Sequence, residues 1–271
     1  MLHTLQKLEK EGFTVELLPV GPIGTVTAQQ MKDAIREDTC LVSVMYANNE
    51  TGAIQPIREI GALCRKRGVL FHTDAVQAAG HLAIDVQRDN IDMLSLSAHK
   101  FHGPKGIGLL FAKSNIQLTS LIRGGGQERG KRAGTENLPG IIGLAAALKD
   151  AQENMQQNTA YITGLRDALR NGLDKIDGAD FNGSREHCLP GTVNYSFQGL
   201  NGEALLSLLS NEGICCSSGS ACSAGSLEPS HVLLALGLSH ETAQSALRFS
   251  LCEYNTMAVS YTHLTLPTKL E

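Results

Sequence analysis

The sequence of 271 residues lacks the features of several specialised protein classes. It contains no run of about eighteen apolar residues, so we expect no membrane-spanning segment. Its net charge of −4 offers no basic surface, and we expect neither nucleic acid nor a membrane as partner. Residues 1–12 alternate Lys and Glu with spaced leucines, which predicts an amphipathic helix rather than a signal peptide. Internal repeats and low-complexity tracts are also absent.

The seven cysteines have neither the spacing of a disulfide framework nor a CxxC pair. An odd number of cysteines without a secretory signal favours reduced thiols and a cytoplasmic location. The nine histidines show no HxxxH or HExxH spacing, so we expect no built-in metal site. Cys40, Cys64 and Cys252 lie among apolar neighbours and are interpreted as structural. Cys215 and Cys216, near an expected strand, are interpreted in the same way, with a role as secondary thiols as the alternative.

Helix and strand patterns alternate through the first half of the chain, which predicts βαβ units and a mostly parallel α/β sheet with flanking helices. The expected helices cover 2–11, 27–36 with Thr27 as N-cap, and 56–67 with Gly68 as its end. The expected strands cover 13–18, 41–46, 69–72, 93–97 and 107–111.

A long helical stretch, from residue 136 to about 172, leads into a region with a different pattern. Short strands are expected there near Val193 and Ala246, with helices from Gly202 and Ser230. We therefore expect a large domain over 1–150 and a smaller α+β domain over 151–256. Residues 257–271 resemble neither part and are excluded from the fold prediction.

Three polar clusters follow three expected strands, at residues 47–50, 73–77 and 97–100. Sheets of this kind carry their chemistry just beyond the carboxyl ends of the strands. The three clusters are therefore expected to meet at one edge of the sheet and to form the site.

Lys100 is the first candidate for chemistry. A single lysine after a strand is more often a solvated surface residue. Lys100 differs because it follows the apolar run 93–96 and precedes the glycine-rich turn 103–108, where backbone can approach a ligand closely. A partly desolvated lysine loses its proton more easily and can condense with an aldehyde, which indicates pyridoxal phosphate. Lys105 is the rival, but it follows a proline in the turn and is expected to be exposed.

Asp74 is the second candidate, because pyridoxal phosphate needs a carboxylate opposite its ring nitrogen to keep that nitrogen protonated. The alternative role for Asp74 is a helix cap or a turn residue. Asn49 and Gln77 can hydrogen-bond to the ring hydroxyl or to a substrate carboxylate. Ser97 and His99 can donate hydrogen bonds to the phosphate.

Two loops complete the candidate site. The glycine-rich, basic segment 123–135 is expected to be a surface loop, with Thr135 as a further phosphate donor. Its other interpretation is a mobile surface loop with scattered arginines. Cys222 lies in segment 217–226, which consists mainly of Ser, Gly and Ala and has little to pack. Such a loop can carry a nucleophilic thiolate into a site and out again.

Together these motifs resemble the cysteine desulfurases of the NifS/IscS-like branch of the class V aminotransferase family. The resemblance covers residues 1 to about 256 and rests on segments 47–52 (ANNETG), 72–77 (HTDAVQ), 97–100 (SAHK), 123–137, 217–231 and 248–250 (RFS). It implies a homodimeric, fold-type I pyridoxal-phosphate enzyme. Such an enzyme converts L-cysteine to L-alanine and holds the sulfur as a persulfide for iron–sulfur cluster assembly.

The resemblance also implies a role for each candidate residue. Lys100 resembles the Schiff-base lysine, and Thr135 resembles the residue that reaches the cofactor phosphate of the partner subunit. Arg248 resembles the clamp for the substrate carboxylate, with Asn49 nearby, and Cys222 resembles the nucleophile that takes the sulfur. Cys222 is also a candidate for transient iron–sulfur ligation. The remaining roles are Asp74 at the pyridine nitrogen, Asn49 and Gln77 near the ring hydroxyl, and Ser97 and His99 at the phosphate and ring.

The family pattern departs from this sequence at both ends. The family has a segment before residue 1 with a phosphate-binding turn and a histidine that stacks on the cofactor, for which His3 is no counterpart. Segment 257–271 lacks the acidic, amphipathic helix of the family. The alternatives are a selenocysteine lyase-type eliminating enzyme, which depends less on a long cysteine loop, and an inactive fragment without a complete cofactor site. The expected partner besides L-cysteine is a sulfur acceptor or an iron–sulfur scaffold protein.

Overall fold

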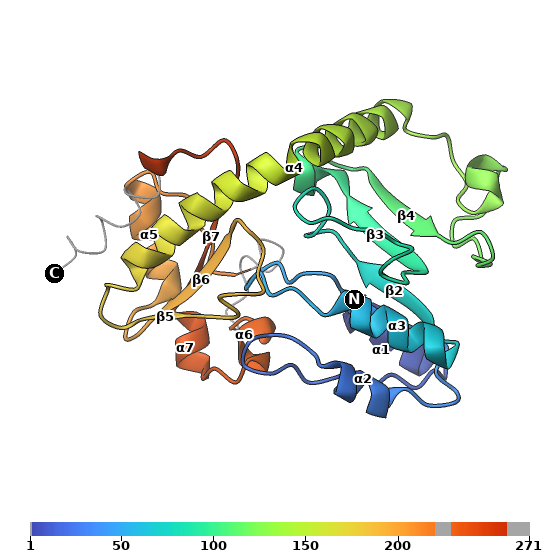
Figure 1. Cartoon of the computed structure of the whole chain (residues 1–271), viewed down its shortest axis with the longest axis horizontal. Helices are drawn as coiled ribbons and strands as arrows, with labels where there is room; N and C mark the ends of the chain where they lie inside the picture. The colour runs from blue at the N-terminus through green and yellow to red at the C-terminus, as the bar shows by residue number, and fades with distance from the viewer. Residues whose placement is uncertain (1, 220–228, 259–271) are drawn as a thin grey trace.

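The computed structural model describes residues 2–219 and 229–258 and contains two β-sheets joined by one long helix (Figure 1). The larger sheet has the strands β1 (Leu41–Met45), β2 (Leu70–Asp74), β3 (Met93–Ser97) and β4 (Gly108–Ala112), in that order. β1, β2 and β3 are parallel and β4 is antiparallel to β3, which confirms the mostly parallel sheet. Met45 pairs with Asp74, and Asp74 pairs with Ser95, so the carboxyl ends of the three parallel strands meet at one edge.

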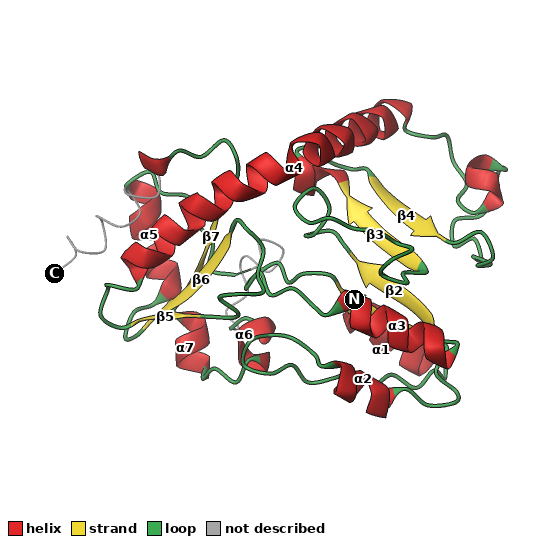
Figure 2. Ribbon diagram, in the orientation of Figure 1, coloured by secondary structure: helices red, strands yellow, loops and turns green. Residues whose placement is uncertain are grey.

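Three helices precede β2, namely α1 (Leu2–Lys10), α2 (Ala28–Ala34) and α3 (Ile57–Arg67) (Figure 2). Each lies within a range for which the sequence predicts a helix. α2 begins with a capping box, in which the Thr27 hydroxyl accepts a hydrogen bond from the Gln30 N–H and the Gln30 side chain accepts one from the Thr27 N–H. α3 ends at Gly68, whose φ of 71° is readily adopted by glycine. No helix within 2–219 and 229–258 is long and apolar enough to cross a membrane.

The strand expected over residues 13–18 is wrong, because these residues form neither strand nor helix. A strand needs a neighbour to pair its backbone groups, and within the described residues the edge strand β1 is paired only with β2. Phe13 and Leu17 are accordingly 53% and 63% exposed. Apolar alternation therefore predicted a strand for which this structure supplies no partner.

The smaller sheet is antiparallel and has the order β5 (Ala179–Phe181), β6 (Thr192–Phe197) and β7 (Ala246–Ser250). The remaining helices are α5 (Gly202–Asn211), α6 (His231–Ala235) and α7 (His240–Gln244). The strands expected near Val193 and Ala246 and the helices from Gly202 and Ser230 are confirmed, since Ser230 is the N-cap of α6. This half of the molecule has the predicted α+β arrangement.

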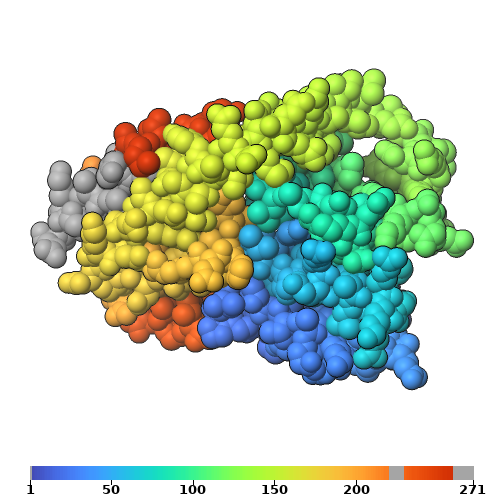
Figure 3. Space-filling model, viewed as in Figure 1, coloured from blue at the N-terminus to red at the C-terminus, as the bar shows by residue number. Residues whose placement is uncertain are grey.

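Helix α4 (Leu138–Leu173) passes residue 150 without a break and contributes to both hydrophobic cores. Leu144 packs in the core of the larger sheet, whereas Leu169 and Leu173 pack in the core of the smaller one. A second contact joins the halves, because Val20 packs against the small apolar cluster that contains Leu233 and Leu236. In the space-filling view, the N-terminal segments accordingly touch the region of α6 and α7 (Figure 3). The boundary near residue 150 stays a prediction, because it falls inside a continuous helix.

The cysteines only partly match their expected structural role. Cys64 is buried in α3 against the larger sheet, as expected. Cys40 and Cys215 are exposed, so the structural interpretation is wrong for both of them. Residues 213–216 form no strand, so the strand expected beside Cys215 is also absent.

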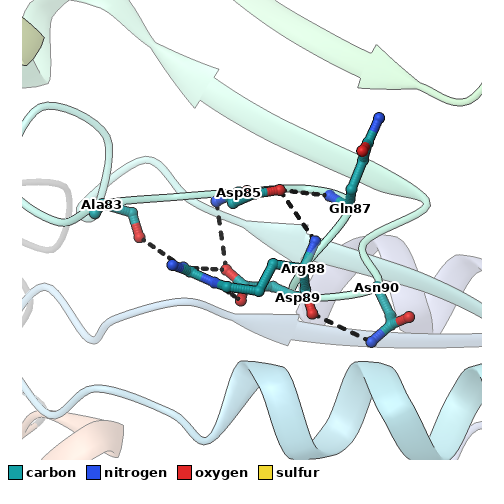
Figure 4. Close-up of polar contacts among 6 residues, drawn as sticks. All are labelled: Ala83, Asp85, Gln87, Arg88, Asp89 and Asn90. Atoms are coloured by element: carbon teal, nitrogen blue, oxygen red, sulfur yellow. Dashed lines mark hydrogen bonds and ion pairs between the residues drawn. The ribbon is translucent and has the colours of Figure 1, made fainter.

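A tight contact holds α3 against the loop of residues 83–90, which is fastened by its own polar side chains (Figure 4). The Asp89 carboxylate is 2% exposed and accepts hydrogen bonds from the Arg88 Nε at 2.8 Å and Nη2 at 3.1 Å. A Cβ added at Gly61 would lie 2.1 Å from the backbone oxygen of Asp89. Glycine is therefore required at position 61 because helix and loop backbones approach each other there.

The close approach predicts that Gly61→Ala destabilises the fold, although alanine is the better helix former. We expect a loss of about 1–3 kcal/mol, since the clash is with backbone and the loop must shift. Gly164→Ala in α4 is the matched control, because nothing lies within 4 Å of its added Cβ. That change should stabilise by roughly 0.4–1 kcal/mol. Urea unfolding of both variants measures the difference, and equal effects would contradict the packing argument.

Candidate active site

The exit of β2 places Asp74 at the sheet edge where polar clusters were expected. Asp74 is half-buried, and its Oδ1 accepts a hydrogen bond from the Val76 N–H at 3.0 Å. The Ala78 N–H donates to the Ala75 carbonyl at 3.0 Å, which forms a tight turn that carries Gln77. Asp74 thus has the turn role of the alternative interpretation, and the turn engages one of its two carboxylate oxygens.

The exit of β3 leads directly into a short 3₁₀ helix, η1 (Ala98–Phe101), which presents Lys100. Ala98 and Phe101 are buried, so His99 is exposed and Lys100 half-buried on the other side of the turn. The Gly103 N–H donates to the Ala98 carbonyl at 2.9 Å, and a Cβ at Gly103 would lie 2.9 Å from that same oxygen. The glycine after the lysine therefore permits the chain to fold back and hold η1 in place.

A hollow of about 210 Å³ lies between the two sheets and brings together most of the predicted residues. Five of them line it, namely Asn49, Gln77, His99, Lys100 and Arg248. The other lining residues are His81, Ile162, the segment Leu189–Thr192, Ser250 and Leu251. The wall opposite Lys100 is thus built from α4, from the segment that leads into β6 and from the end of β7, all of which lie far along the chain from Lys100.

The loop of residues 48–52, which we call the junction loop, connects the two walls. The Asn48 Oδ1 accepts hydrogen bonds from the Glu50 N–H at 2.8 Å and the Thr51 N–H at 3.0 Å, which fixes the shape of the loop. The smaller sheet then binds to it, since Asn194 donates to the Glu50 carbonyl and the Arg248 Nη1 donates to the Asn49 carbonyl at 2.9 Å. Arg248 is positioned in the hollow through this loop.

Cys222 lies outside the described residues, but the chain on either side of segment 220–228 is described. Ser217 pairs with Arg248 through two backbone hydrogen bonds of 3.0 and 2.6 Å. After the segment, the Ser230 hydroxyl donates to the buried Glu50 carboxylate at 2.5 Å. Both ends of the cysteine-bearing segment are therefore attached beside the hollow, at β7 and at the junction loop.

Three predicted residues do not line this hollow. Asp74 and Ser97 lie at the ends of β2 and β3, on the same sheet edge but outside its lining. Thr135 is exposed on the glycine-rich loop, which contains the short helix η2 (Gln127–Gly130) and extends away from the smaller sheet (Figure 1). The prediction of a surface loop over 123–135 is confirmed, with Ala133 as its one buried residue.

Sequence reasoning missed two titratable residues of the site, His81 and Glu50. The His81 Nε2 lies 3.3 Å from the Lys100 carbonyl, and Glu50, a residue of the junction loop, is 3% exposed. The sequence gives no signal for His81, because His81 follows a turn and does not stand at the end of a strand. Glu50 sits inside a recognised cluster, yet only its contact with Ser230 shows its structural role.

Burial affects the pKa of two histidines near the site, His81 and His72. Burial lowers the pKa of His81, although the Lys100 carbonyl and Glu253 oppose this effect. Burial likewise lowers the pKa of His72, which the nearby Asp74 opposes. The His72 ring bridges Ser43 at 2.8 Å and Ser95 at 2.9 Å, so it ties the three parallel strands together beside Asp74.

Comparison with known families and proteins agrees with this arrangement. The family model for class-V aminotransferases matches residues 1–259. A protein named cysteine desulfurase IscS from Clostridium botulinum is 53% identical over 259 residues, covering 94% of this chain and 65% of that protein. A protein of the same name from Methanosarcina thermophila is 49% identical over 256 residues, covering 94% and 63%. The chain therefore spans slightly less than two thirds of the length of these relatives.

Solved structures show the same fold. A structure titled NifS-like protein superimposes with a TM-score of 0.91 at 38% identity, covering 99% of this chain and 71% of that one. A structure titled SspA in complex with cysteine gives a TM-score of 0.78 at 39% identity, covering 94% and 71%. The predicted fold class, an α/β large part with a smaller α+β part, is confirmed.

The lowered pKa of His81 predicts a pH-dependent contribution to stability. The unfolded chain takes up a proton on this residue as the pH falls through about 6.5, before the folded chain does. The free energy of unfolding should therefore decrease as the pH drops below that value. His81→Gln should flatten this decrease, whereas His240→Gln, at an exposed position, should leave it unchanged. Urea unfolding between pH 5 and 8 gives the slopes, and an unchanged slope in His81→Gln would show that His81 is protonated normally.

Proposed function

The chain belongs to the class-V aminotransferase family, and from this we propose that it acts as a pyridoxal-phosphate-dependent cysteine desulfurase. One observation carries the proposal: an amine, Lys100, and a guanidinium, Arg248, face one hollow. The segment that contains Cys222 is attached beside the same hollow, through Ser217. These are the three groups that the conversion of L-cysteine to L-alanine and enzyme-bound sulfur requires.

The residues present fit pyridoxal phosphate by the chemistry of their side chains. The Lys100 amine would hold the aldehyde, and the Asp74 carboxylate at the strand exit would hold the protonated ring nitrogen. Asn49 and Gln77 would donate hydrogen bonds to the ring hydroxyl. The phosphate would be held by Ser97 and His99, with Thr135 of the partner subunit as a further donor. When bound, the cofactor supplies an electron sink for the bonds at the substrate Cα.

Arg248 is proposed to bind the carboxylate of L-cysteine, for which a guanidinium provides two parallel donors. Its position is set from two directions, by the Asn49 carbonyl and by the backbone pairing with Ser217. The substrate amine is then directed toward Lys100 across the hollow. The Lys100 amine, which lines the same hollow, would move a proton at the substrate Cα.

The sulfur step is assigned to Cys222. Its thiolate attacks the sulfur of L-cysteine, an S–S bond forms as the Cβ–S bond breaks, and the carbon skeleton leaves as L-alanine after it takes up a proton. Cys222 follows Gly219 by three positions, a stretch that spans at most about 11 Å of extended chain. Gly219 itself is placed beside Glu50, since a Cβ added to it would lie 3.6 Å from that carboxylate.

The same proposal covers the larger assembly. We propose a cytoplasmic homodimer that delivers persulfide sulfur to an acceptor or to an iron–sulfur scaffold protein, with Cys222 as a transient ligand of the cluster. The exposed position of Thr135, on a loop that extends from the larger sheet, supports a contribution to a partner's site. The division into parts 1–150 and 151–256 is supported by the two separate cores.

Cofactor capture tests the role of Lys100 directly. With added pyridoxal phosphate, the chain should develop a visible absorption band, and borohydride should fix one cofactor to the peptide that contains Lys100, as found by mass spectrometry. Lys100→Ala should lose both signals, whereas Lys105→Ala, at an exposed position five residues away, should keep them. Equal capture by Lys100→Ala would reject the assignment, and no capture by the unaltered chain would favour the inactive-fragment alternative.

Substrate binding tests the role of Arg248. Arg248→Lys keeps the charge but loses the paired donors, so we expect KM for L-cysteine to rise about 10- to 100-fold with a smaller change in kcat. The same shift should appear in the L-cysteine concentration needed to change the cofactor absorption. Arg36→Lys, at a surface ion pair with Glu16, serves as the control and should change neither. An unchanged KM in Arg248→Lys would assign the substrate carboxylate to another residue.

A further inference from the structure

Cys188 lies between two arginines of α4, in the segment that leads into β6. The Arg170 Nη2 is 3.2 Å from the Cys188 Sγ, and the Arg166 Nη1 is 3.5 Å from the same atom. Cys188 is 8% exposed and its thiol points toward the Arg185 carbonyl at 3.7 Å. Two guanidinium groups at hydrogen-bond distance from one sulfur can donate hydrogen bonds to a negatively charged oxygen attached to that sulfur.

Arg170 adds an independent observation, because it is a buried charge with an unused donor. Its side chain is 5% exposed, and its Nε is buried with no hydrogen-bond partner. Among the described residues no carboxylate lies within ion-pair distance of it, since the nearby Asp174 pairs with Arg185 instead. Its Nη1 donates to the Arg185 carbonyl at 3.3 Å, and the Phe181 ring lies 4.6 Å from the guanidinium, which leaves the Nε without an acceptor. A buried guanidinium normally requires a full set of acceptors, so this one has capacity for another.

We propose that Cys188 is a modification site for hydrogen peroxide, with Arg166 and Arg170 as the residues that hold the oxidised sulfur. The sulfur attacks one peroxide oxygen, so that an S–O bond forms while the O–O bond breaks. The second oxygen leaves as hydroxide and takes up a proton to become water. Sulfur loses two electrons, peroxide gains two, and the product is a cysteine sulfenate. The Arg170 Nε, which belongs to the guanidinium whose Nη2 contacts this sulfur, is the proposed donor to the added oxygen.

Cys64, a buried cysteine of α3, provides the contrast with Cys188. Cys64 is 0% exposed in an apolar core, where burial raises the pKa of its thiol to about 11. The pKa of Cys216 is raised to about 11 for the same reason. Within the described residues, neither Cys64 nor Cys216 accepts a hydrogen bond from an arginine, as Cys188 does. The arrangement at Cys188 therefore selects this thiol rather than buried thiols in general.

The location links the modification to the candidate active site. Cys188 pairs with Ala53 across an isolated bridge, and the Leu189 N–H donates to the Gly52 carbonyl at 2.9 Å. Leu189 lines the hollow that contains Lys100. The modification lies one residue from this wall, although its chemistry does not depend on the proposed function. Labelling of the thiol therefore tests it separately from any desulfurase assay.

The experiment exposes the full chain to hydrogen peroxide, stops the reaction with catalase, and unfolds the protein in the presence of dimedone, which labels sulfenates. Mass spectrometry then compares the peptides. We expect at least about tenfold more label at Cys188 than at Cys64, as the charge-assisted contacts imply. Arg170→Lys and Arg166→Gln should each lower the label at Cys188 several-fold without changing Cys64.

Arg185→Lys is the matched control, because Arg185 belongs to the same cluster but uses its guanidinium on Asp174. The amount of dimedone label at Cys188 in Arg185→Lys should match the amount in the unaltered chain. Circular dichroism shows whether each variant is folded. If Arg170→Lys unfolds, the comparison is made with Arg166→Gln alone, because Arg166 is partly exposed and its replacement disturbs the core less. Equal labelling of Cys188 and Cys64, or labelling of Cys188 that both arginine variants leave unchanged, would overturn the proposal.

Discussion

The hydrogen bonds of the junction loop, residues 48–52, are the constraint on which the candidate site depends. The Asn48 side chain gives the loop its shape by accepting two backbone N–H groups. The loop in turn offers its carbonyl groups to Asn194 and Arg248 of the smaller sheet. Without this contact the Lys100 wall and the Arg248 wall would be connected mainly by α4 and would have no fixed separation. A site formed between two sheets requires a contact that fixes their separation, because Lys100 lies on one wall and Arg248 on the other.

Glu50 extends this constraint to the cysteine-bearing segment. A carboxylate buried to 3% exposure must be compensated, and the Ser230 hydroxyl does so at 2.5 Å. Ser230 also caps α6, so the same side chain connects the loop after β1 with the helix that follows the segment. A structural contact and a helix cap thereby bring distant parts of the chain to one side of the hollow.

Much of the fold could be predicted because local signals were strong. Thr27, Pro56 and Gly68 mark helix ends through capping and backbone preferences that operate within a few residues. The strand over 93–97 was predicted with its observed bounds. The strand over 13–18 failed for the opposite reason, since a strand forms only when a partner is available. The prediction that Cys40 is a buried structural residue was also wrong, because apolar neighbours in the sequence do not establish that a side chain is buried in the fold.

The sequence by itself determined which residue types stand at the strand exits, and hence the chemical character of the site. Lys100, Asn49 and Gln77 follow strands whose parallel order was predictable, so their approach to one sheet edge was as well. Only the tertiary structure decided that Arg248 and the segment Leu189–Thr192 close the hollow, that His81 lies against Lys100, and that Cys188 sits between two arginines. These contacts join residues far apart in the chain. Their geometry depends on how α4 and the junction loop orient the two sheets, and no short-range pattern encodes that orientation.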